Sequence, residues 1–192
     1  MLKPPHDSEK KLAIEEAALE LFTKQGFGST TVPSIAEKAR VGSGTIYRYF
    51  ESKEELVNRI FQQWQERLYH ALTDAYPEKG STREKYDHIW GRLAAFQKNY
   101  PVAFDFLEMM YYTPHLDRES KSGRLRLLKF LNQLVHEGRE EFRPLSSDAL
   151  IAIVWGAFVG LVRASTTGRI SLDDDLLNES REAIWKGIIH TR

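Results

Sequence analysis

Apolar residues recur at helical spacing along almost the whole chain, and no stretch shows the strict alternation of a half-buried strand. The clearest case is residues 8–25, whose apolar side chains fall at i, i+3, i+4 and i+7 and form one stripe of an amphipathic helix. Gly26 follows directly, as is typical of a helix end. The sequence therefore predicts an all-α fold, and 42% hydrophobic residues among 192 are enough to build a core.

Glycine, proline and capping signals divide this periodicity into about nine helices. Thr31 is placed to cap a short helix with Pro33 in its first turn, and Ser52–Glu55 fits a capping box that begins a long one. No flexible spacer occurs near residue 52, so we expect a three-helix domain, residues 1–52, rigidly joined to a larger helical domain, residues 53–192. The expected helices cover residues 8–25, 32–39, 43–50, 53–76, 82–100, 101–113, 119–140, 146–167 and 172–190.

The helices expected at 32–39 and 43–50 are short and joined by a tight turn, which is the arrangement of a helix-turn-helix. Ile46 and Phe50 are spaced i, i+4 and can anchor the second helix to a core. Ser43, Gly44, Thr45, Tyr47 and Arg48 are then left outside. Hydroxyls, a guanidinium and a glycine that permits close approach suit a face that enters the major groove of DNA.

The same stretch resembles the N-terminal domain of TetR/AcrR transcriptional regulators. Many positions agree in order and spacing across residues 10–60: Ala17–Phe22, Gly26–Phe27, Thr31–Val32, Ile35–Ala39, Val41, Gly44–Phe50 and Ser52–Leu56. The resemblance implies a regulator that binds DNA through this domain and senses a small molecule through a variable helical domain.

The resemblance also implies roles for single residues. Gly44 and Thr45 would approach bases or backbone, and Tyr47 and Tyr49 would place hydroxyls on phosphates. Arg48 would read or clamp the site. The alternatives are that the tyrosines are core aromatics and that the cations are solvated. The predicted DNA-contacting residues are Thr31, Ser43, Gly44, Thr45, Tyr47, Arg48, Tyr49 and Lys53.

Three residues depart from the family pattern. Pro33 stands where arginine or lysine is frequent, and Arg40 stands where glycine is common. Gly42 replaces a serine-like cap, so Ser43 is expected to take over the capping. The formal net charge is zero, and residues 1–56 hold eight basic and nine acidic side chains, so any DNA affinity must come from where the charges sit.

Residues 53–192 hold all 4 tryptophans, which fit either a packed core or an aromatic-lined cavity for an apolar effector. Both interpretations stay open for each aromatic residue. The predicted effector-binding residues are Phe61, Trp64, Gln65, Trp90, Phe104, Trp155 and Phe158.

Residues 151–162 are apolar nearly all round, a pattern that needs cover on every side. Gly156 and Gly160 would let a partner helix approach, and two helices from each subunit would form a two-fold interface, although packing within the chain is the alternative. The longest apolar run, around residues 149–162, is interrupted by Gly156, Gly160 and Trp155 and is expected to be too short to span a bilayer. The predicted dimer-interface residues are Ala152, Gly156, Val159, Gly160, Arg163, Leu177, Ala183, Ile184 and Gly187.

The sequence contains no nucleophile elbow, phosphate loop or dinucleotide fingerprint. Glu84 and His88, like His136 and Glu140, share a helix face but have no third ligand nearby in sequence. We therefore expect no enzyme activity, no metal and no cofactor. The lack of cysteine and of an apolar N-terminal segment suits a cytoplasmic protein.

These observations predict a ligand-responsive repressor that binds a palindromic operator in double-stranded DNA as a homodimer. A small hydrophobic or aromatic effector would release it, and no membrane partner is expected. Two other classes stay open. One is a ligand carrier with a vestigial helix-turn-helix, supported by Pro33 and the neutral charge. The other is a helical-bundle enzyme, which would need a polar cluster in its cavity.

Overall fold

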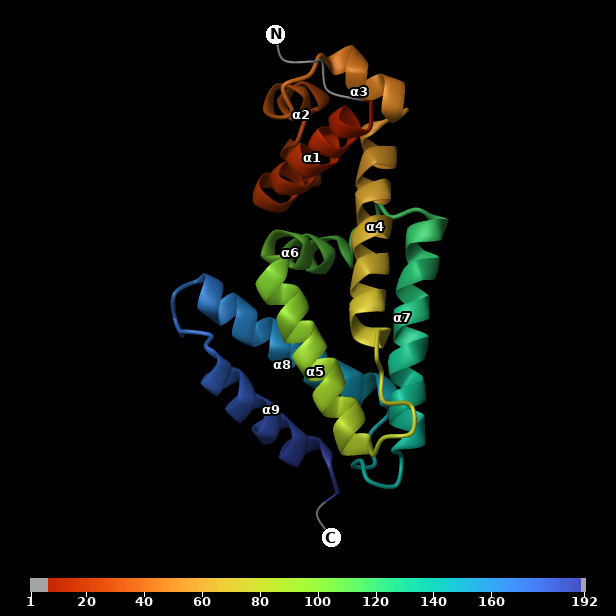
Figure 1. Ribbon diagram of the computed structural model, residues 1–192, viewed down its shortest axis with the longest axis vertical. Helices are drawn as coiled ribbons and strands as arrows, with labels where there is room; N and C mark the ends of the chain where they lie inside the picture. The colour runs from red at the N-terminus through yellow and green to blue at the C-terminus, as the bar shows by residue number, and fades with distance from the viewer. Residues whose placement is uncertain (1–6, 191–192) are drawn as a thin grey trace. The chain divides into compact units, whose positions relative to one another are not determined.

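The computed structural model describes residues 7–190, and this part of the chain is folded into α-helices joined by short connections (Figure 1). Between residues 7 and 190 the only extended pairing is an isolated antiparallel bridge between Phe142 and Ile189. The predicted all-α fold of about nine helices is confirmed. The helices are α1 (Asp7–Ser29), α2 (Val32–Lys38), α3 (Ser43–Tyr49), α4 (Lys53–Thr73), α5 (Thr82–Asn99), α6 (Pro101–Met110), α7 (Arg118–Glu137), α8 (Ser147–Thr166) and α9 (Asp174–Ile188).

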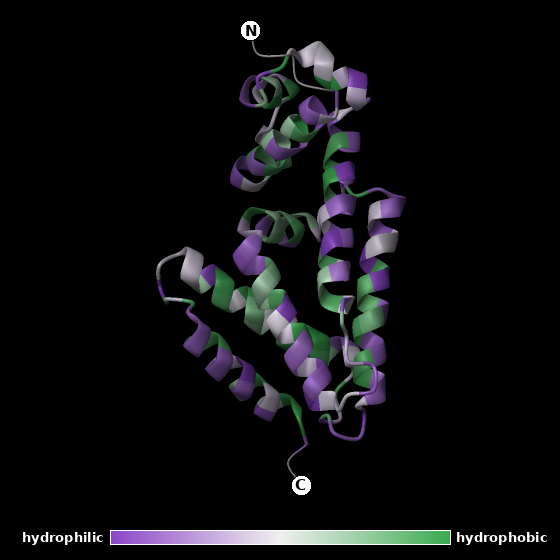
Figure 2. Cartoon of the chain, viewed as in Figure 1, coloured by the Kyte–Doolittle hydropathy of each residue, from purple (hydrophilic) through white to green (hydrophobic). Residues whose placement is uncertain are grey.

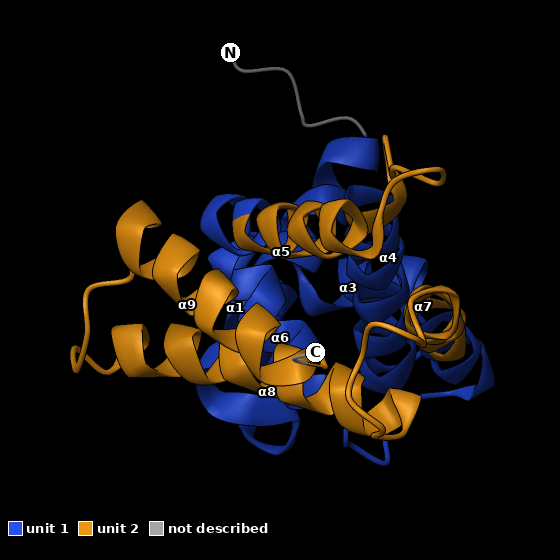
Figure 3. Cartoon of the chain, turned by 90° about the horizontal axis from the view of Figure 1, so that it is seen from below, with its two compact units in different colours: residues 1–71, 95–124 blue, residues 72–94, 125–192 orange. Residues whose placement is uncertain are grey.

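The chain divides into two compact units, coloured blue and orange in Figure 3. The first unit contains residues 1–71 and 95–124, and the second contains residues 72–94 and 125–192. Helices α4, α5 and α7 each contribute residues to both units. The compact units do not divide at residue 52, and the expected boundary there stays a prediction.

Most helix ends lie within a few residues of their predicted positions, and the differences have local causes. Gly26 has φ 80° and ends the regular part of α1 as predicted, but a further helical turn continues to Ser29. Helix α4 ends at Thr73 rather than near residue 76, and Ala75 just beyond it is left-handed, with φ 54°. The prediction that Ser43 caps α3 is wrong: Gly42 is the N-cap without a side-chain bond, and Ser43 is the first helical residue.

The core of the first unit is built where α1 packs on α2, α3 and α6. Phe22 lies at its centre, with ring centroids 5.7 Å from Phe27 and 6.4 Å from Phe106. Burial of these aromatic and aliphatic side chains is the main source of stability for so short a helical domain. The fully buried residues include Ile14, Phe22, Ile35, Ile46, Leu56, Ile60, Phe61, Phe104 and Phe106.

A buried carboxamide joins α4 to the start of α7 in the same unit. Asn58, which is 5% exposed, donates from Nδ2 to the carbonyls of Glu54 at 2.8 Å and His115 at 2.9 Å. Its Oδ1 accepts from the Asp117 amide and from the Ser120 hydroxyl, both at 2.8 Å. All four hydrogen-bonding positions of this side chain are therefore used.

In the second unit, charged side chains join α5 to α9. Arg83 pairs with Asp87 of its own helix at 2.7 Å and with Glu182 of α9, and Arg181 lies 3.3 Å from Asp87. The hydrogen bond from Arg83 is the main reason that the pKa of the Glu182 carboxyl is lowered. These pairs fix the charged face of α9 against α5.

Helix α8 carries apolar residues along most of its length, as the green positions in Figure 2 show. It has 20 residues and is, by length and composition alone, apolar enough to cross a membrane, which corrects the expectation that the run is too short. Only 22% of its most apolar window is buried. The rest of that window is exposed, so α8 presents apolar surface to its surroundings.

Candidate DNA-binding surface and ligand cavity

Helix α3 is anchored by the two residues predicted to anchor it. Ile46 and Phe50 are each 2% exposed, and α3 packs against both α1 and α2. The turn before α3 contains Arg40 with φ 56°, a left-handed conformation that disfavours residues with a Cβ atom. A glycine at this position would adopt the same conformation without that cost.

The remaining side chains of α3 form an exposed face. Ser43, Gly44, Tyr47 and Arg48 are exposed, and Tyr47 is 57% exposed, so it is not a core aromatic. A Cβ atom added to Gly44 would meet nothing within 4 Å. Thr45 is half-buried. Polar donors and a small residue on one short helix match the chemistry that groove reading requires.

Arg48 and Tyr49 are held by an acidic residue at the start of α1. The Arg48 Nη2 donates to Asp7 Oδ1 at 2.7 Å and to the Tyr49 hydroxyl at 2.8 Å. The Tyr49 hydroxyl lies 2.8 Å from the same carboxylate oxygen, to which it can donate. The Tyr49 hydrogen bond, followed by the charge of Asp7, raises the pKa of the Arg48 guanidinium.

Thr31 and Lys53 both have roles inside the domain. Thr31 is exposed and is the N-cap of α2: its hydroxyl accepts from the Ser34 amide at 3.2 Å, as predicted. The Lys53 ammonium donates to the carbonyls of Phe27 and Thr30, each at 2.8 Å, and lies 4.1 Å from the Phe27 ring centroid. A cation at the end of α1 stabilises the negative pole of that helix, a role that sequence reasoning missed.

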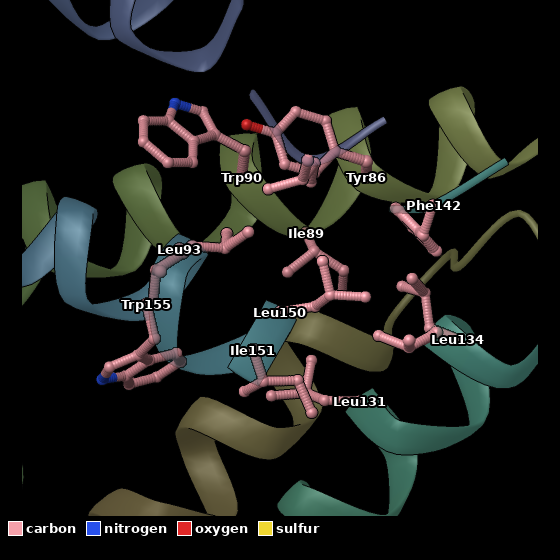
Figure 4. A pocket seen from close by; sticks show the side chains of 13 residues that line it. Tyr86, Ile89, Trp90, Leu93, Leu131, Leu134, Phe142, Leu150, Ile151 and Trp155 are labelled. Carbon is pink, nitrogen blue, oxygen red and sulfur yellow. The ribbon is translucent and has the colours of Figure 1, made fainter. Parts of the chain in front are cut away.

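The second unit contains an apolar cavity (Figure 4). Its volume is about 60 Å³. Its surface is almost entirely carbon. The walls come from α5, α7, α8 and the segments around residues 142 and 188: Tyr86, Ile89, Trp90, Leu93, Leu131, Leu134, Val135, Phe142, Leu150, Ile151, Val154, Trp155 and Ile188.

Three lining side chains carry a polar atom. The Tyr86 hydroxyl donates to the Arg181 carbonyl at 2.9 Å, and burial raises the pKa of that phenol. The Trp90 Nε1 is buried without a hydrogen-bond partner, although its residue is only 3% exposed. Trp155 contributes the third polar atom, and no wall residue carries a formal charge. The cavity therefore suits an apolar guest.

The predicted effector residues fall into two places. Trp90 and Trp155 line the cavity, and Phe158 packs edge-on against Trp90 at 5.4 Å without lining it. The others belong to the first unit: Trp64, for instance, lies 5.2 Å from Tyr100. The prediction of effector-binding residues selected mainly aromatic side chains, whereas most residues of the cavity wall are aliphatic. The predicted residues that do not line the cavity are Phe61, Trp64, Gln65, Phe104 and Phe158.

The predicted interface residues of α8 lie mostly on its open side. Ala152, Gly156, Gly160 and Arg163 are exposed, whereas Val159 is 8% exposed. The cavity residues of α8, among them Ile151, Val154 and Trp155, point to another side of the helix. On α9, Ala183 and Gly187 are exposed and Leu177 and Ile184 are half-buried. Cβ atoms added at Gly156, Gly160 or Gly187 would meet nothing within 4 Å.

No group of three potential metal ligands occurs among residues 7–190. Glu84 accepts from the Ser81 amide at 2.8 Å, and the His88 ring contacts the Leu72 carbonyl at 3.1 Å. The two helix-face pairs noted in the sequence thus gain no third ligand in this range.

Comparison with known proteins matches both parts of the chain. Residues 14–60 match the bacterial regulatory proteins of the tetR family, and residues 60–190 match a tetracyclin repressor-like C-terminal domain. The regulator YuxN of Bacillus subtilis is 28% identical over 152 residues, which are 76% of this chain and 51% of YuxN. The repressor KstR2 of Mycobacterium tuberculosis is 26% identical over 138 residues, 67% of each chain. The chain spans about half the length of YuxN.

Solved structures share the fold. A TetR family regulator from Marinobacter aquaeolei has a TM-score of 0.81 at 22% identity, covering 96% of this chain and 98% of that one. The fatty acid degradation regulator FadR of Bacillus halodurans has a TM-score of 0.72 at 21% identity, covering 96% and 97%. The two family matches together run from residue 14 to residue 190. The chain therefore belongs to the TetR family of DNA-binding bacterial transcriptional regulators.

Proposed function

We propose that this protein is a repressor that binds a palindromic operator as a homodimer and is released by a small hydrophobic or aromatic effector in the cytoplasm. The observation that carries the proposal is the coexistence, in one chain, of an exposed polar α3 and an uncharged apolar cavity in the second unit. Relatives named as repressors, such as KstR2, support the sign of regulation.

Selection of bound duplexes from a random DNA library, at stated salt, tests the DNA-binding part. If the protein is a homodimer with one recognition helix per subunit, the selection should recover a palindrome. Its half-sites should lie about one helical turn, roughly 34–36 Å, apart. Arg48→Ala and Tyr47→Phe should weaken binding to that duplex. Arg169→Ala, an exposed cation outside α3, serves as the matched control. Recovery of no motif would instead favour a ligand carrier.

The cavity supports the choice of effector class. Its uncharged walls would leave a buried carboxylate or ammonium without compensation, at a cost of several kcal/mol or more. A neutral ring or an alkyl chain avoids that cost. A charged head group, where present, would have to remain outside the walls.

Tryptophan fluorescence gives a direct binding test because Trp90 and Trp155 line the cavity. We expect alkyl and aromatic probes of graded length to change the emission and to lower affinity for the selected duplex. The relatives named as fatty acid regulators make straight-chain acyl probes the first to use. Leu131→Trp should fill the cavity and abolish both effects, whereas Leu125→Trp, on an exposed position of the same helix, should not.

The open side of α8 supports the homodimer. It exposes Ala152, Gly156 and Gly160, and Ile153 is 45% exposed, on a helix with few charges. An exposed apolar stripe with small residues is suited to close helix packing across a two-fold axis. A membrane is the other environment in which such a helix is stable, and sedimentation of the purified protein without detergent distinguishes the two.

A further inference from the structure

Asp7 occupies two donors of α3, the Arg48 guanidinium and the Tyr49 hydroxyl, that were predicted to contact DNA. Its Oδ1 accepts from Arg48 Nη2 at 2.7 Å and lies 2.8 Å from the Tyr49 hydroxyl, and its carbonyl lies 3.0 Å from that hydroxyl. The Arg48 guanidinium also stacks on the Tyr49 ring, 4.9 Å from the centroid. These contacts join Asp7 to Arg48 and Tyr49, which follow it by 41 and 42 positions in the sequence.

The geometry resembles a phosphate complex. An anionic oxygen held by a guanidinium and a phenolic hydroxyl is the same donor set that proteins use for a DNA phosphate oxygen. Asp7 lies in the first turn of α1, where the helix dipole favours a carboxylate. The carboxylate is 73% exposed and the guanidinium 56% exposed, so solvent and DNA both reach the pair.

We propose that Asp7 is an intramolecular stand-in for a DNA phosphate, which restrains Arg48 and Tyr49 and lowers the affinity of the free protein for any duplex. The inference rests on the proposed DNA-binding function. Binding DNA requires Arg48 to exchange one anionic partner for another, and the displaced carboxylate then remains close to the phosphates. Asp7 therefore weakens DNA binding in two ways: it competes with the phosphate for Arg48, and its negative charge repels the phosphates.

Asp7→Asn keeps the shape of the side chain and removes its charge. With the selected palindrome and with a scrambled duplex of the same length, we expect the variant to bind about two- to fivefold more tightly, the range of an exposed ion pair. Because Arg48 then engages a phosphate more fully, the plot of log affinity against log salt should steepen by up to about 0.9 for each subunit.

Two controls separate the pair from a general charge effect. Glu51→Gln removes the same charge directly after α3, from an exposed residue that does not contact Arg48, and should tighten binding less. In an Arg48→Ala/Tyr49→Phe background, the gain from Asp7→Asn should disappear. The proposal is overturned if Asp7→Asn binds no more tightly than wild type, gains no more than Glu51→Gln, or keeps its gain in that background.

Failure of the proposed function gives a different result. A wild-type protein that selects no sequence from the library would contradict the regulator assignment, whereas the scrambled duplex still measures whether Asp7 restrains Arg48. Specific binding by the wild type combined with an unchanged Asp7→Asn affinity would contradict only the role of Asp7.

Discussion

Replacing Asn58 with alanine should destabilise the protein by about 2–3 kcal/mol. The substitution removes the acceptor of the Asp117 amide and of the Ser120 hydroxyl, and Ser120 is 0% exposed. A buried polar group left without a partner costs about 1–3 kcal/mol, and each further lost hydrogen bond about 0.5–1.5 kcal/mol. The higher helix propensity of alanine returns about 0.5 kcal/mol of this loss.

Urea unfolding at 25 °C and fixed protein concentration measures the effect, because subunit association would otherwise change the apparent stability. For a chain of this size, the expected loss corresponds to a fall in Tm of about 4–12 °C. Asn178→Ala, at an exposed position of α9, is the control for helix propensity and should leave stability unchanged or slightly raised. If Asn58→Ala lies within about 0.5 kcal/mol of that control, the carboxamide does not stabilise the junction of α4 and α7.

Three further outcomes follow from features described above. Arg40→Gly should raise the free energy of unfolding by up to about 1 kcal/mol, because φ 56° costs glycine little, and urea titration would show it. Gly156→Trp should convert the homodimer to monomer in analytical ultracentrifugation, whereas Gly91→Trp, equally open on α5, should not. Glu182 has a lowered pKa because of its hydrogen bond with Arg83, so its stabilisation is present above the usual carboxyl pKa and is lost as pH falls through the lowered one. Glu182→Gln should therefore be less stable than wild type at pH 7 and equally stable once the pH lies below the lowered pKa of Glu182, and a coincident pH profile for both proteins would contradict this.

Local signals were sufficient to predict the helix-turn-helix. Ile46 and Phe50 are both buried because their i, i+4 spacing places them on one side of a short helix, and Thr31 caps α2 because its hydroxyl needs only the amide three residues on. Each of these features depends on fewer than ten neighbouring residues.

Contacts between segments that are distant in the sequence could not be predicted from such local signals. The Lys53 ammonium meets carbonyls 26 and 23 residues earlier in the chain, and Asp7 meets Arg48 across 41 residues. The cavity depends on how α5, α7, α8 and the end of α9 pack, and aliphatic residues such as Leu131 and Leu150 look like ordinary core positions in sequence. The sequence shows their helical spacing. It does not show which apolar face of a helix borders an unfilled space, because that depends on the packing of distant segments.

Helix α8 carries the cavity residues Ile151 and Trp155 on one side and the open residues Ala152 and Gly156 on another. An effector that shifts the helix by a fraction of an ångström must therefore also shift the surface proposed to meet a second subunit. Thermodynamic linkage makes this coupling reciprocal. If association of the subunits changes the affinity for the effector by some factor, a bound effector changes the affinity of association by the same factor. For the proposed homodimer, effector affinity should consequently depend on total protein concentration.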